Sequence, residues 1–205
     1  MRKRKAKPSA KPNRNKRVQV ACATMVVYLF ICLLGAAYAE DFAVTVYGGR
    51  VTDGDASHAI SPNVDFVDSN LVVGAFAWTF KRFLDDKLSL EVEGNVGKYF
   101  GDQDHWEFNA AVAGRWHKFP WSDTVATTIA WGVGPSYATE VPKVEETTHT
   151  SSQQWLVFWF AEITLGPPES RWAGIFRLHH RSTGFETVAK DGGSNTLAVG
   201  LKFRF

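Results

Sequence analysis

The sequence predicts an all-β protein, an eight-stranded antiparallel transmembrane β-barrel of the outer-membrane type. Three observations support this prediction: an export signal at the start, apolar residues that alternate with polar ones in eight segments, and a last segment whose apolar face ends on Phe205. Closure of a sheet into a barrel leaves no unpaired strand edge in lipid. Beyond the export signal, no segment of useful length has a helical period.

The first 39 residues have the order of a secretory signal peptide. Met1–Arg17 carries nine Lys and Arg and no acidic residue, Val18–Gly35 is almost wholly apolar, and an Ala-Tyr-Ala cleavage pattern ends at Ala39. We therefore expect cleavage after Ala39 and a single barrel domain over residues 40–205. A permanent membrane anchor is the alternative, because the apolar run approaches spanning length. The cleavage pattern favours removal.

Removal of this leader changes the charge and the cysteine count. Nine of the 23 basic residues leave with it and none of the 21 acidic ones, so 14 remain against 21 and the net charge becomes −7. The formal net charge of +2 for the full sequence therefore comes from the leader and gives no reason to expect a nucleic-acid partner. Cys22 and Cys32 both lie in the leader, so the mature chain has no disulfide, no cysteine-based metal site and no thiol nucleophile.

The first four strands are expected at 42–52, 71–83, 88–100 and 106–119. A long loop with Gly, Pro and Asp separates the first strand from the second, and the tight turn 84–87 separates the second from the third. The third and fourth segments alternate most clearly. Their expected outward residues are Leu88, Leu90, Val92, Val96, Trp106, Phe108, Val112 and Trp116.

The last four strands are expected at 124–139, 155–166, 171–182 and 194–205. A tight turn precedes the first and the third of them, and the polar loop 140–154 precedes the second. In 155–166, Glu162 falls on the inward face as expected. The inward face also carries three apolar residues, which we expect to plug one end of the barrel: Leu156, Phe158 and Phe160.

Connections that alternate between long and short predict that both termini lie in the periplasm and that the long loops lie outside the cell. A soluble β-sandwich or lipocalin-like barrel is the alternative, with apolar residues inside and charges outside. Strand parity alone does not separate the two. The terminal Phe205 and the density of outward Trp residues favour the membrane, and localisation in the outer membrane of a Gram-negative cell is expected.

A dense polar cluster, His179-His180-Arg181-Ser182, ends the otherwise apolar strand 171–182. His180 and Ser182 are two residues apart and share the lipid-directed face. An imidazole beside a hydroxyl group can take its proton and make serine a nucleophile toward an ester.

A third group normally fixes the tautomer of such an imidazole. The last strand runs antiparallel to the one before it, so its first residues lie beside the end of that strand. Counting back from Phe205 by twos places Asn195 on the outward face, where its side-chain oxygen can accept a hydrogen bond from His180.

The same residues have a plainer explanation. A His-x-Ser pattern is a weak signal, and the spacing alone favours a basic belt at the outer rim, in which His179, His180 and Arg181 pair with lipopolysaccharide phosphates. Metal binding is disfavoured because adjacent histidines on a strand point to opposite faces.

The leader, the eight strands, the run Phe176-Arg177-Leu178-His179-His180-Arg181-Ser182 and the final strand ending in Phe resemble the PagL family. These proteins are outer-membrane lipid A 3-O-deacylases, and related sequences are called acyloxyacyl hydrolases. The overall plan covers nearly all of the mature chain, and the motif covers about Phe176–Phe205.

The resemblance implies that His180 is the general base and Ser182 the nucleophile. In the family, an Asn follows the serine and a Glu at the start of the last strand completes the triad; Thr183 and Asn195 stand at these positions here. We expect Thr183 and the backbone N–H groups around it and Gly184 to serve the oxyanion. Two loop residues could replace the missing acid, Glu186 and Asp191.

The expected function is that of an outer-membrane esterase that removes an ester-linked acyl chain from lipid A. No cofactor and no metal are expected, since the oxyanion site activates the ester. The expected partners are lipopolysaccharide and outer-membrane lipid, and a homodimer is left open. The alternative is a non-catalytic small barrel, acting as an adhesin, anchor or binding protein through its loops. A pore is disfavoured, because side chains fill an eight-stranded interior.

Overall fold

Burial alternates from residue to residue along the strands, and the alternation places apolar side chains outside and charged ones inside. The structure is a computed structural model that describes residues 41–53, 59, 61–148, 152–184 and 186–205. The predicted signal peptide, with its cleavage site after Ala39, lies outside these residues. Within them, no helix is long and apolar enough to cross a membrane.

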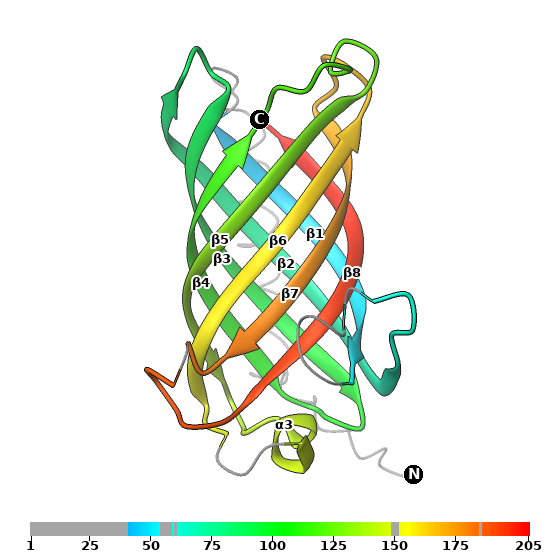
Figure 1. Ribbon diagram of the computed structural model, residues 1–205, viewed down its shortest axis with the longest axis vertical. Coiled ribbons are helices and arrows are strands. Elements are labelled where there is room, and N and C mark those ends of the chain that lie inside the picture. The colour runs from blue at the N-terminus through cyan, green and yellow to red at the C-terminus, as the bar shows by residue number, and fades with distance from the viewer. Residues whose placement is uncertain (1–40, 54–58, 60, 149–151, 185) are drawn as a thin grey trace, which may run out of the picture. The chain divides into compact units, whose positions relative to one another are not determined.

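Eight antiparallel strands form a closed barrel in which each strand pairs with its sequence neighbours and β1 pairs with β8 (Figure 1). The bounds of the strands are β1 Phe42–Thr52, β2 Phe66–Phe83, β3 Leu88–Gly101, β4 Trp106–Trp116, β5 Ala126–Ala138, β6 Trp155–Gly166, β7 Trp172–Ser182 and β8 Gly193–Arg204. A short helix, α3, spans Lys143–Thr148. The predicted fold class is thereby confirmed.

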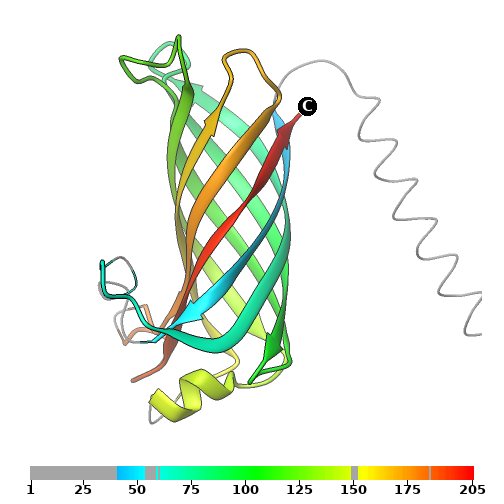
Figure 2. The same ribbon diagram turned by 90° about the vertical axis from the view of Figure 1, so that its right-hand side faces the viewer.

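The chain end closes the barrel. The backbone N–H of Phe205 donates to the carbonyl oxygen of Phe42 at 2.9 Å, and the Phe42 N–H donates to the Phe205 carbonyl at 3.2 Å. The Phe205 ring stacks on Phe42 and Phe203 and lies tilted against Phe76. The start of β1 and the end of β8 therefore share one end of the barrel, here called the terminus end; α3 lies at the opposite end, the α3 end (Figures 1 and 2).

The outer surface is a band of exposed apolar side chains, and the interior is charged, which is the opposite of a lipocalin-like barrel. Tryptophans that are half exposed or nearly so mark both ends of the barrel, as aromatic girdles do. At the α3 end these are Trp106 and Trp155, and at the terminus end Trp78, Trp116, Trp121 and Trp172. The buried charged residues and histidines of the strands are Glu91, Glu93, Glu107, Arg115, Glu162, Arg177, His179, Arg181 and Lys202.

Some expected boundaries were wrong. β2 begins at Phe66 rather than Leu71, because Phe66 still pairs with Thr52 beyond an irregularity in the β1–β2 register. β4 ends at Trp116, since a turn begins at Phe119, whose carbonyl accepts from the Ser122 N–H. The expected loop 140–154 contains α3.

The lengths of the connections also depart from strict alternation. Residues 102–105 form a short connection from β3 to β4 at the α3 end, close to the predicted gap 101–105, and 117–125 form a longer connection at the terminus end. The short connection is stabilised locally, because the His105 ring stacks on Tyr99 with centroids 4.4 Å apart and the Asp102 N–H donates to the backbone carbonyl oxygen of Asp68.

Candidate active site on the outer face of the barrel

His180 lies on the outer face of β7 near the α3 end, between two cross-strand neighbours. The register places Trp159 of β6 on one side of it and Asn195 of β8 on the other. The imidazole Nδ1 is 2.5 Å from Asn195 Oδ1, and the ring lies over Trp159 with centroids 4.5 Å apart. An amide oxygen only accepts, so Nδ1 carries the proton and donates it. Nε2 is then the basic nitrogen.

Ser182 ends β7 on the same face, two residues beyond His180, and is partly buried. Its hydroxyl oxygen accepts a hydrogen bond from the Gly184 backbone N–H at 3.3 Å. No hydrogen bond joins Ser182 to His180 in the described part of the chain. The structure therefore brings His180 and Asn195 together, and it leaves Ser182 adjacent but not engaged.

Thr183 and Gly184 form the turn that follows Ser182. Gly184 has φ +63°, a left-handed conformation that glycine adopts without strain. The Thr183 carbonyl accepts from the Val188 N–H at 3.0 Å, and its Oγ1 accepts from the Glu186 N–H at 3.3 Å. The Thr183 hydroxyl hydrogen thus stays available as a donor near Ser182. Asp191 is the other loop residue, besides Glu186, that could replace the missing acid, and its carboxylate accepts a hydrogen bond from the Gly192 N–H.

His179 and Arg181 alternate with His180 and point into the barrel, where their exposed fractions are 1% and 0%. Arg181 donates to both carboxylate oxygens of Glu145 on α3, at 3.0 and 3.1 Å, and Ser194 donates to the same carboxylate. The basic belt proposed for the outer rim is therefore wrong for these two residues. Strand parity turns them inward, and Arg181 instead holds α3 over the end of the barrel.

The interior contains an ion network that sequence reasoning did not identify. Arg177, fully buried, donates to both oxygens of Glu93 at 2.6 and 2.8 Å and through Nε to Glu162 at 2.8 Å. Its guanidinium carbon lies 4.0 Å from the centroid of the Phe160 ring. Glu162 also pairs with Lys202 and, at 2.9 Å, with Arg115. The inward parity of these residues was readable from the sequence, but their partners across the barrel were not.

Nearer the α3 end, His179 links two further buried groups. Its Nδ1 lies 2.9 Å from Tyr47 Oη, and its Nε2 lies 2.8 Å from Glu107 Oε1. Phe158 packs against the same ring, with centroids 4.7 Å apart. Phe158 and Phe160 are fully buried, as their predicted inward direction requires. That they plug one end of the barrel stays a prediction, and Phe160 lies against Arg177 of the ion network.

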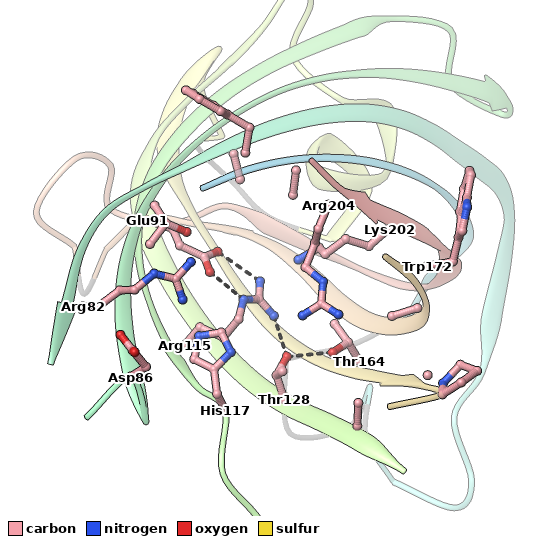
Figure 3. A pocket seen from close by; sticks show the side chains of 18 residues that line it. Arg82, Asp86, Glu91, Arg115, His117, Thr128, Thr164, Trp172, Lys202 and Arg204 are labelled. Carbon is pink, nitrogen blue, oxygen red and sulfur yellow. Dashed lines mark hydrogen bonds and ion pairs between the residues drawn. The ribbon is translucent and has the colours of Figure 1, made fainter. Parts of the chain in front are cut away.

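A cavity of about 140 Å³ opens at the terminus end, away from His180 (Figure 3). Its lining includes Arg82, Arg115, Lys202 and Arg204. The cavity and the His180–Asn195 pair are thus separate features at opposite ends of the barrel. No group of three or more His, Cys, Asp or Glu side chains in the described ranges is arranged to hold a metal ion.

Comparison with known proteins finds similarity at the level of structure alone. No family model and no curated protein matches the chain in sequence. The outer membrane enzyme PagL matches with a TM-score of 0.55 at 9% identity, over 79% of this chain and 99% of PagL. The fold is that of an outer-membrane β-barrel.

Two other barrels of this kind match with lower TM-scores. Neisserial surface protein A matches at 0.49 and 10% identity, over 80% of this chain and 97% of the other. The N-terminal barrel domain of Pseudomonas aeruginosa OprF matches at 0.47 and 12% identity, over 81% and 98%. At such identities the likeness concerns the fold, so the function must be argued from the site.

Proposed function

We propose that this protein is an outer-membrane esterase that hydrolyses an ester-linked acyl chain of lipopolysaccharide by a Ser–His mechanism. The observation that supports this most is the pairing of His180 with Asn195 on the outer face of the barrel, at 2.5 Å. A histidine whose Nδ1 is held by a neighbour, with a serine two residues along the same face, supplies the orienting group, the base and the nucleophile that a Ser–His mechanism uses.

In this mechanism the Nε2 atom of His180 takes the proton of Ser182 while the serine Oγ attacks the ester carbonyl carbon. The oxyanion that forms is stabilised by the Gly184 N–H, which already lies 3.3 Å from Oγ, and by the Thr183 hydroxyl. Collapse of the intermediate breaks the ester C–O bond, and His180 returns the proton to the departing alcohol. Water then attacks the acyl-serine with His180 as base and releases the fatty acid.

The position of the pair supports a membrane lipid as substrate. Trp159 packs on the imidazole, and the outer face beyond it is apolar, with Phe176 49% and Val199 64% exposed. An acyl chain in the bilayer can lie along such a surface without leaving lipid. With the terminus end in the periplasm, the α3 end and His180 face the outer leaflet, where lipopolysaccharide is found.

This orientation has its own test. A peptide tag inserted after Thr147, in α3, should be labelled from outside intact cells, and a tag after Pro168, in the β6–β7 turn, should not be. Labelling of the Pro168 tag alone would place the His180–Asn195 pair at the inner leaflet, away from lipopolysaccharide, and would contradict the proposed substrate.

A second function, that of a non-catalytic barrel, is favoured by one observation. Ser182 Oγ accepts from Gly184 and makes no hydrogen bond with His180 in the described structure. In unliganded enzymes such bonds are often long and form with substrate present, so the observation does not decide against catalysis.

Mass spectrometry of lipid A decides between the two functions. Lipid A from cells that express the protein should lose one hydroxyacyl group relative to cells that lack it, and fatty acid should appear in equal amount. Unchanged lipid A in cells with a folded, membrane-inserted barrel would favour the non-catalytic function.

A further inference from the structure

Four Lys and Arg side chains line the cavity at the terminus end, and one of them has no ion-pair partner in the described part of the chain. The buried cations around it are each paired: Arg115 with Glu91 and Glu162, and Lys202 with Glu162. At the rim, Arg82 pairs with Asp41 at 3.2 Å. Among the described residues, Arg204 alone of the basic residues that line the cavity forms no ion pair.

Arg204 is also incompletely hydrogen-bonded. One terminal nitrogen donates to the Ser170 carbonyl oxygen at 2.7 Å, while Nε is buried and has no acceptor. Figure 3 shows the side chain extending into the cavity beside Lys202 and Thr164. The guanidinium therefore has donors beyond the one that Ser170 uses, and Arg204 is part of the lining of the cavity.

Other groups in the cavity do not supply the missing negative charge. Asp86 lines the rim, but it is exposed on the β2–β3 turn and lies beside Arg82, across the cavity from Arg204 (Figure 3). Burial and the nearby Arg115 lower the pKa of His117 to about 4, so the ring is neutral at neutral pH. It neither balances nor adds to the charge of Arg204.

We propose that the cavity at the terminus end is a binding site for a small carboxylate, held by the guanidinium of Arg204. The guanidinium of arginine is a planar group of N–H donors that matches the two oxygens of a carboxylate. The Thr164 hydroxyl, bonded at 2.7 Å to Thr128, lines the same cavity and offers a further polar contact.

The size of the cavity limits the ligand. The volume of about 140 Å³ is well below the roughly 300–1,000 Å³ of sites for drug-sized molecules. A free acid of a few carbon atoms, or one carboxylate group of a larger solute, fits this space. The mouth opens at the end where the chain terminates, so the ligand comes from the periplasmic side in the orientation proposed above.

Acetate and succinate are suitable probes, added to the protein purified in detergent, with sodium chloride at equal ionic strength as the reference. Saturable binding by calorimetry is expected, together with a shift of one arginine Nε–H resonance in ¹⁵N spectra. Arg204→Gln should weaken binding at least tenfold. Arg82→Gln, which alters a paired rim cation, should change binding less than twofold.

Two further measurements keep the test independent of one variant. Arg204→Lys retains the charge but removes the planar group of donors, so it should also weaken binding at least tenfold. In the unaltered protein, succinate should protect one arginine from phenylglyoxal. Absence of saturable binding, equal binding of chloride, tighter binding of phosphate, or undiminished binding by a folded Arg204→Gln protein would each overturn the proposal.

Discussion

His180 and Asn195 face each other across β7 and β8, with the imidazole Nδ1 2.5 Å from the amide oxygen. This contact joins two residues that are 15 positions apart in the chain, and it turns Nε2 away from Asn195. A neutral amide orients a neutral imidazole, but it stabilises an imidazolium less than a carboxylate does. The catalytic roles of both residues stay predictions.

Ser182→Ala should abolish deacylation and leave the barrel folded. The hydroxyl accepts a single weak hydrogen bond near the barrel end, so the stability change should be within about ±0.5 kcal/mol. His180→Asn should abolish activity too, and the double variant should be little worse than either single one, because members of a catalytic unit are not additive. Lipid A mass spectrometry and heat-modifiable gel migration check both points. Full activity of a folded Ser182→Ala protein would show that Ser182 is not the nucleophile.

Asn195→Ala should slow the reaction without ending it, and Asn195→Glu should retain or raise the rate. Asn195 positions His180 and does not touch the reacting atoms, so kcat should fall in the Ala variant while KM stays within about twofold. Fatty-acid release from purified lipopolysaccharide measures both. The control is Thr196→Ser, at the next position of β8, whose side chain is buried on the inner face. Equal loss in the control would assign the effect to the barrel as a whole.

Period-two alternation sufficed to predict the barrel, the inward position of Glu162 and the proximity of His180 to Asn195. Those inferences need only the face of each residue and the pairing of adjacent strands. The ion pairs across the lumen could not be predicted, because Arg177 and Glu93 are 84 residues apart and strand parity says nothing of which inward side chains meet. For the same reason, the docking of α3 through Glu145 and Arg181 was missed in a segment that has the composition of a polar loop.

The stability of the barrel should fall as the pH is lowered from about 6.5 to about 4. Burial lowers the pKa of His117 and of His105 to about 4 in the folded protein, against 6.5 for an ordinary histidine. The unfolded chain therefore binds more protons in this window, and the stabilisation present above it is lost as the pH falls. For His117 the loss is at most about 3 kcal/mol, at about 1.4 kcal/mol per pKa unit, and partial exposure of the ring reduces it.

Urea unfolding in lipid vesicles at a series of pH values measures this effect. His117→Asn should flatten the pH dependence, since it removes one of the two titrating rings. His105→Asn, at the other end of the barrel, is the matched variant and should flatten it independently. A slope that neither substitution changes would assign the acid sensitivity to the buried carboxylates.

Arg177→Met should destabilise the barrel by about 3–5 kcal/mol, because it leaves Glu93 and Glu162 as buried carboxylates with one less cation. Methionine keeps much of the side-chain volume, so the loss reports charge rather than a cavity. Adding Glu93→Gln to Arg177→Met should recover part of the stability, since the doubly substituted interior again balances its charge. Arg171→Met, at an exposed position before β7, is the control and should change stability by less than about 0.5 kcal/mol. Urea unfolding at pH 7.5 measures all three. A loss of less than 1 kcal/mol in Arg177→Met would indicate that water reaches Glu93 and Glu162. An interior open to water would in turn favour the pore function that the eight-stranded fold disfavours.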